Sequence, residues 1–82
     1  MTNQDIQNDI ELMKKIVERL KKEKSQKEDW INSEKREKKE QYQDIEMINI
    51  WTEQATEIAL EIDVLENTIK SLEAELKAEA QK

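Results

Sequence analysis

The sequence predicts an all-α protein: an antiparallel helical hairpin or coiled coil that self-associates into a dimer or a small helical bundle. Three observations lead to this prediction. The 82 residues include no Gly and no Pro, apolar residues recur at heptad spacing near both ends, and charged residues make up 41% of the chain. Because tight turns, β-hairpins and phosphate-binding loops depend on glycine, its absence argues against β folds, Rossmann folds and P-loops.

The first helix is expected over residues 3–30. Thr2 lies three residues before Asp5, a spacing typical of a helix N-cap. Apolar residues then recur at alternating spacings of four and three, which places them on one face of a helix. We expect this face to make the helix–helix contact, through Ile6, Ile10, Met13, Val17 and Leu20.

The second helix is expected over residues 34–80 and has the stronger pattern. Apolar residues fill the a and d positions of four successive heptads, which is a specific signal for a coiled coil. The a positions are Ile48, Ala55, Ile62, Ile69 and Leu76. The d positions, three residues later in each heptad, are Trp51, Ile58, Leu65 and Leu72.

We expect a turn at 31–33, so that residues 1–82 form a single helical domain. Residues 21–40 carry 14 charged side chains, which separates the two apolar patterns. With that turn, the numbers of facing residues add to about 65, and Lys21 lies beside Asp44. The alternative is one continuous helix of residues 3–80, roughly 115–120 Å long, paired in a coiled-coil dimer.

In the expected hairpin, the second helix extends beyond the start of the first from about residue 60 onward. Its apolar strip would then be too large to leave in water, so we expect a second copy of the chain to cover it. The residues expected to mediate this self-association are Ile48, Trp51, Ile58, Ile62, Leu65, Ile69, Leu72 and Leu76.

Four further apolar residues are candidates for binding a different protein. Ile50, Leu60 and Val64 form a second stripe on the later helix, because successive residues are offset by roughly 100°. This stripe is either a docking strip for a partner or part of the core of a three- or four-helix bundle. Trp30 stands in the charged stretch and is a candidate interface anchor, since tryptophan is enriched among binding hot spots.

The charge pattern bears on several classes of partner. The net charge is −6, and seven acidic residues and no basic residue lie between residues 41 and 69. Binding to nucleic acid is therefore not expected, because it relies on clustered Lys and Arg. No apolar run approaches the ~20 residues of a membrane span, so we expect no membrane binding and, without a targeting signal, a cytoplasmic protein.

The chain contains no His and no Cys, so the usual ligands of zinc, haem and iron–sulfur clusters are absent. We expect no metal, no cofactor and no enzymatic activity. The function expected from the sequence is a non-catalytic protein-binding module, such as an adaptor, assembly factor or inhibitor, that presents helical faces as a homo-oligomer. The alternatives are a structural coiled-coil spacer and an acidic decoy that blocks a nucleic-acid-binding protein.

Overall fold

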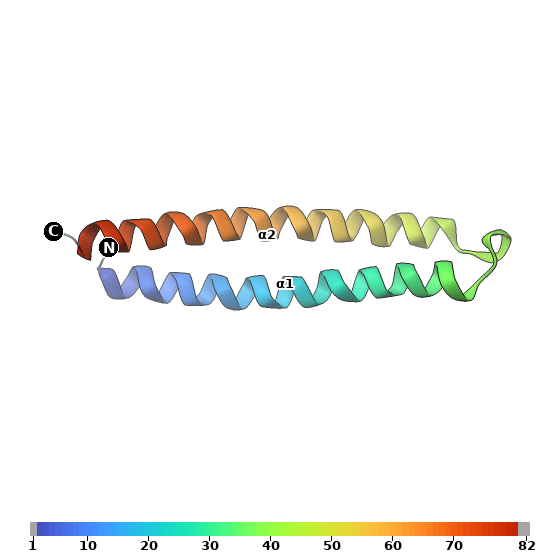
Figure 1. Cartoon of the computed structure of the whole chain (residues 1–82), viewed down its shortest axis with the longest axis horizontal. Helices are drawn as coiled ribbons and strands as arrows, with labels where there is room; N and C mark the ends of the chain where they lie inside the picture. Colours follow the sequence, from blue (N-terminus) through green and yellow to red (C-terminus); the bar gives the residue numbers. More distant parts are fainter. Residues whose placement is uncertain (1, 81–82) are drawn as a thin grey trace.

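The computed structural model describes residues 2–80 and confirms an all-α helical hairpin (Figure 1). Helix α1 spans Asn3–Glu37, a short 3-10 turn η1 spans Glu40–Tyr42, and helix α2 spans Ile45–Ala80. The two long helices lie side by side and antiparallel, with the start of α1 and the end of α2 at one end of the molecule and the turn at the other. The molecule measures 64 × 15 × 14 Å, so the chain is not one continuous helix.

Helix α1 begins as the sequence predicts. The Asp5 backbone N–H donates to the Thr2 hydroxyl at 3.2 Å, and the Thr2 N–H donates to the Asp5 carboxylate at 3.4 Å. This reciprocal capping box satisfies two backbone donors that the first turn of a helix leaves free. The Asp5 charge also interacts favourably with the positive end of the helix dipole.

The turn lies at residues 38–44, and the predicted turn at 31–33 is wrong because those residues belong to α1. Nothing at 31–33 stops a helix, since the segment contains neither Gly nor Pro. Pairs at i, i+4 spacing also support the helix on both sides of this segment. Lys24 pairs with Glu28, and Lys38 pairs with Glu34 at 3.0 Å.

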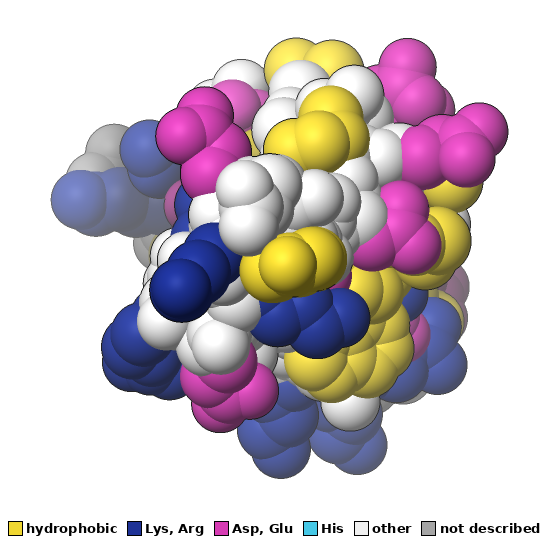
Figure 2. Space-filling view, turned by 90° about the vertical axis from the view of Figure 1, so that its right-hand side faces the viewer, with side chains coloured by type: hydrophobic (Ala, Val, Ile, Leu, Met, Phe, Trp, Pro, Cys, Tyr) yellow, Lys and Arg dark blue, Asp and Glu magenta, His cyan; other side chains and the backbone are white. Residues whose placement is uncertain are grey.

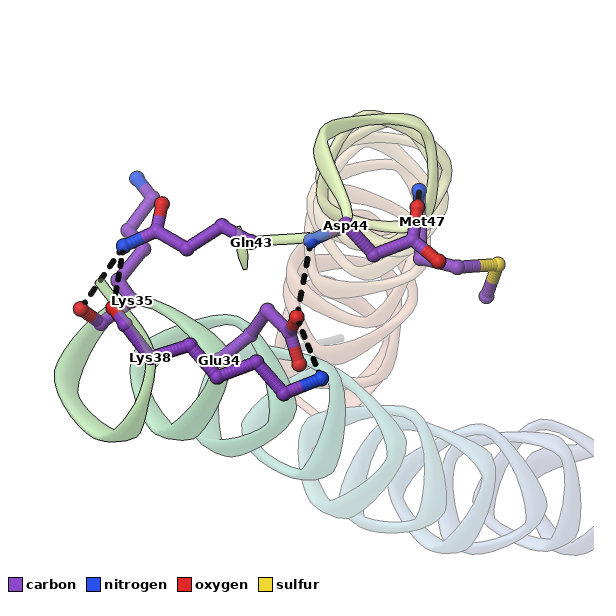
Figure 3. Close-up of polar contacts among 6 residues, drawn as sticks. All are labelled: Glu34, Lys35, Lys38, Gln43, Asp44 and Met47. Carbon is purple, nitrogen blue, oxygen red and sulfur yellow. Dashed lines mark hydrogen bonds and ion pairs between the residues drawn. The ribbon is translucent and has the colours of Figure 1, made fainter. Parts of the chain in front are cut away.

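Side chains, not glycine, hold the end of α1 (Figure 3). The chain leaves the helix through Lys38 in an extended conformation, with φ −118° and ψ 142°. The Gln43 side-chain amide donates to the carbonyl oxygens of Lys35 and Lys38, both at 3.0 Å. These bonds satisfy carbonyl groups that the last turn of a helix leaves without partners.

The start of α2 is fixed by two carboxylates. The Asp44 side chain caps the helix by accepting a hydrogen bond from the Met47 N–H at 3.0 Å. Glu34 reaches across from α1 and accepts from the Asp44 N–H at 2.9 Å, which ties the two helices together. The Asp44 N–H and the Lys38 ammonium both bond the Glu34 carboxylate, and they lower the pKa of that carboxyl below its ordinary value.

The new turn position changes the pairing of the helices. Trp30 packs against Trp51 with ring centroids 5.7 Å apart, and Lys21 pairs with Glu66 at 3.3 Å. The numbers of facing residues therefore add to 81 and 87 at these contacts, whereas a turn at 31–33 would make them add to about 65. The expected pairing of Lys21 with Asp44 is accordingly wrong.

Each helix turns a continuous row of a and d positions toward the other. In α1 the 4–3 spacing continues past the predicted apolar residues through four more positions, all of them partly buried: Lys24, Lys27, Ile31 and Glu34. In α2 all nine predicted a and d positions are buried or partly buried. The main apolar cluster contains Ile6, Ile10, Val17, Leu20, Ile62 and Ile69.

This packing corrects the expected overhang of α2. Because α1 has 35 residues and α2 has 36, the two helices match in length and α1 covers the apolar strip of α2. Leu65, Leu72 and Leu76 pack against the main cluster of the same chain. The uncovered strip that led us to expect self-association through these residues therefore does not exist, and self-association itself stays a prediction.

Candidate protein-binding surface

The hairpin has two broad sides, and one of them is charged. Lys14 pairs with Glu73 at 3.8 Å, and Lys21 pairs with Glu66 at 3.3 Å. The two lysines are seven residues apart, as are the two glutamates, so both ion pairs lie in one row along the same side. We call this the charged side. Exposed pairs of this kind contribute little to stability, ~0–1 kcal/mol each.

The opposite side, which we call the apolar side, carries an open groove of about 480 Å³ between the helices. Ile16 of α1 and Leu60 and Val64 of α2 line this groove. Leu60 is 61% exposed and Val64 is 64% exposed. Leu12 lies one turn before Ile16 and is also exposed, so large apolar side chains face solvent from both helices.

The apolar side continues toward the turn. Trp30 lies fourteen residues after Ile16, and Ile50 lies fourteen residues before Val64. Since residues at multiples of seven share a face of a coiled coil, Trp30 and Ile50 belong to the apolar side as well. They are 39% and 40% exposed.

Trp30 is held in place by two neighbours. Its ring packs against Trp51 at a tilt of 52°. The Lys27 ammonium lies 4.5 Å from the centre of the Trp30 ring, within the range of a cation–π interaction. The indole is therefore a fixed surface feature and not a free side chain, which lowers the entropy cost of binding to it.

The four residues predicted to bind a partner all lie on this one side, but the structure does not bring them into a single patch. Leu60 and Val64 share the groove, whereas Trp30 contacts Trp51. Ile50 lies about 15 Å from Leu60 along the helix axis. The sequence analysis named Trp30 but not Leu12 or Ile16 of α1 as a candidate, although the fourteen-residue spacing between Ile16 and Trp30 could have linked them.

The two edges of the hairpin differ in charge. Residues 14–36 of α1 contain nine basic and five acidic side chains, and residues 45–69 of α2 contain six acidic and no basic side chains. Figure 2 views the turn end and shows exposed hydrophobic side chains, with most basic side chains below and most acidic ones above. The apolar side thus has a basic border from α1 and an acidic border from α2.

Among residues 2–80, no three side chains of the metal-binding types come together at one point. Within the same range, neither helix is apolar over a length that would cross a bilayer.

The fold and this surface define an antiparallel two-helix coiled coil with one charged and one apolar side. The chain matches no protein-family model, no curated protein and no solved structure.

Proposed function

We propose that this chain is a non-catalytic protein-binding module that works as a homo-oligomer, in the manner of an adaptor, assembly factor or inhibitor. One observation carries the proposal. The exposed large apolar side chains Trp30, Ile50, Leu60 and Val64 lie on one side of the hairpin, while ion pairs occupy the other side. An exposed apolar groove such as the one lined by Leu60 and Val64 is typical of sites where proteins bind one another.

The position of Trp30 supports the proposal. The neighbouring a and d positions of α1 are occupied by Lys24 and Lys27, so this part of the hairpin does not depend on a large apolar core. A tryptophan that the core does not require, held by a second ring and partly open to solvent, has the properties of a binding hot spot. The charged residues around it would disfavour nonspecific aggregation.

The non-catalytic part of the proposal is supported by composition. Without His, the chain lacks the side chain most often used as a general base near neutral pH, and without Cys it lacks the strongest nucleophile at that pH. The groove between Leu60 and Ile16 is open along the hairpin, whereas sites for small molecules enclose most of the ligand surface.

The two alternative functions receive less support. A spacer separates two partners best as a long rod, whereas this chain folds back on itself into a hairpin 64 Å long (Figure 1). An acidic decoy needs an uninterrupted acidic surface, whereas Glu66 and Glu73 of α2 are paired with Lys21 and Lys14 of α1.

The test compares two adjacent exposed residues of α2. Ile50 lies on the apolar side, and Asn49 is rotated by about 100° around the helix toward the charged side. Both are changed to Lys, and complexes are cross-linked in the cells that produce the protein and identified by mass spectrometry. We expect Ile50→Lys to lower the yield of cross-linked complexes at least fivefold and Asn49→Lys to leave it unchanged.

Circular dichroism confirms that both variants remain helical. Equal yields from the two variants would contradict the proposal. A complex that forms in both variants and dissociates when the salt is raised from about 0.05 to about 0.5 M would favour the acidic decoy instead, because salt screens exposed charges.

A further inference from the structure

The hairpin exposes more surface than a compact protein of its size. Its accessible surface is 6439 Å², whereas a compact monomer of 9.8 kDa exposes about 5,200 Å². Part of the excess is apolar and lies at the groove formed by Ile16, Leu60 and Val64. Covering the apolar side would remove this surface from water.

We propose that the apolar side binds the apolar side of a second copy, which gives an antiparallel four-helix bundle. This inference rests on the proposed function, because it names the occupant of the same surface. The area is sufficient. A face 64 Å long and 15 Å wide offers roughly 960 Å² per chain, and stable interfaces bury ~800 Å² per partner.

Two symmetric arrangements can bring the apolar sides together. A two-fold axis along the length of the hairpin places α1 of one copy over α2 of the other. A two-fold axis across the hairpin places α1 over α1 and α2 over α2. The charges distinguish these arrangements, because opposite charges attract across an interface and like charges repel.

Residues 14–36 of α1 and residues 45–69 of α2 lie at the same level along the hairpin, since the turn at 38–44 separates them almost symmetrically. The lengthwise axis therefore places the basic part of α1 over the acidic part of α2 twice in the dimer. The crosswise axis also reverses the second copy end to end, so like segments meet only near its centre, and the basic residues of α1 near the turn no longer face the acidic part of α2. We therefore assign the two-fold axis to the long direction of the hairpin.

The borders of the groove agree with this arrangement. Arg19 and Glu61 line opposite edges of the groove in one chain. Around the lengthwise axis, Arg19 of each copy lies level with Glu61 of the other. Each copy therefore presents to the other a surface in which both the apolar residues and the charges are complementary.

The arrangement leaves one end of the bundle for another protein. It places the two turns together, and Tyr42 at the tip of each turn is exposed. Because this residue lies beyond the paired faces, a pair of tyrosines remains available at one end of the bundle. Tyrosine is among the residues enriched in binding hot spots.

The first part of the test measures mass by sedimentation equilibrium on the purified chain. We expect the wild type to have twice the 9.8 kDa chain mass. Leu60→Lys combined with Val64→Lys places two charges in the groove and should weaken dimerisation at least tenfold. The matched control, Asn49→Lys combined with Thr56→Lys, adds the same charge to exposed positions away from the groove and should remain dimeric.

The second part measures the orientation. The chain has no Cys, so Gln41→Cys carries one spin label per copy. The lengthwise axis predicts a distance between the labels below about 35 Å, because adjacent helices pack ~10 Å apart. The crosswise axis would put the labels about 60 Å apart, because the turn lies some 21 residues from the centre of the groove.

The outcomes separate this inference from the proposed function. A dimer with the short distance, lost in the groove variant and kept in the control, supports the inference. A label distance near 60 Å overturns the arrangement. The wild type could instead remain monomeric up to about 100 μM while Ile50→Lys still reduces cross-linking in cells. That result would show that the apolar side does not bind a second copy, and it would leave the proposed function standing.

Discussion

The two halves of the hairpin have the same helical backbone, but the side chains between their helices differ. In the termini-proximal half, residues 3–20 and 62–80, the a and d positions are apolar and form the main cluster. In the turn-proximal half, residues 21–61, three a and d positions of α1 are charged: Lys24, Lys27 and Glu34. The first half has an apolar interior, whereas the second combines the buried residues Ile48 and Ala55 with charged and aromatic side chains.

The turn-proximal half shows how a helix pair tolerates charged side chains at its interface. Lys24 lies beside Ala55 and Ala59 of α2, which line the same hollow. Small residues opposite leave room for the long aliphatic part of lysine, which covers apolar surface while its ammonium group stays in water. This half therefore buries fewer apolar side chains than the other half, and it also exposes Trp30 and Ile50.

The comparison predicts that equivalent truncations will have different effects in the two halves. Ile69 is buried in the main cluster, whereas Ile31 is only partly buried. Ile69→Ala should lower the free energy of unfolding by about 2–4 kcal/mol, and Ile31→Ala by about 1 kcal/mol. Urea unfolding followed by helical circular dichroism at one fixed protein concentration measures both.

Equal losses of unfolding free energy in Ile69→Ala and Ile31→Ala would mean that the turn-proximal half is as well packed as the other half. A larger loss at Ile31 would reverse the comparison.

A smaller effect is expected for the aromatic contact in the turn-proximal half. Trp30→Ala removes both the ring contact with Trp51 and the cation–π interaction with Lys27, at a cost of about 1–2 kcal/mol. Lys27→Met keeps the aliphatic side chain and removes only the charge, so its cost should be about 0.5 kcal/mol. Thermal unfolding measures both values, and near-ultraviolet circular dichroism reports the ring contact directly.

If Trp30→Ala leaves both stability and the near-ultraviolet signal unchanged, the two rings are not in contact in solution. A cost of Lys27→Met as large as that of Trp30→Ala would show that the lysine, and not the ring pair, holds this half together.

Much of the fold could be predicted because helical periodicity is a local property of the sequence. The apolar spacing of four and three identified the contact face of both helices, and the Thr2–Asp5 pair located the start of α1. The turn was misplaced because the sequence offers no Gly or Pro to mark it. It depends on side-chain bonds from Glu34 and Gln43 that span up to ten residues, and such bonds leave no periodic pattern.

The candidate site was predicted in part for the same reason. The exposed residues Ile50, Leu60 and Val64 follow from the periodicity of one helix. Their neighbour Ile16 comes from the other helix, and which residues of two helices lie together depends on the register. Since the turn sets the register of the two helices, an error of about nine residues in its position concealed the groove.

The smallest predicted effect concerns Glu34 of α1, whose carboxylate accepts a hydrogen bond from the start of α2 at the turn. Hydrogen bonds from the Asp44 N–H and the Lys38 ammonium lower the pKa of Glu34, so the ionised form is bonded in the fold. A carboxyl whose pKa is lower in the folded state stabilises that state above its ordinary pKa, and the contribution disappears as the pH falls through the lowered value. We therefore expect the turn to loosen only below pH 4.5.

Nuclear magnetic resonance can follow this step at a single atom. The Asp44 amide shift should titrate with a midpoint below 4.5, and Glu34→Gln should abolish that titration while Glu40→Gln, an exposed residue of the same turn, preserves it. A midpoint at or above the ordinary value would show that the carboxylate is not bonded. A titration that survives in Glu34→Gln would show that it comes from another carboxyl, and the Asp44 amide would then not report a bond to Glu34.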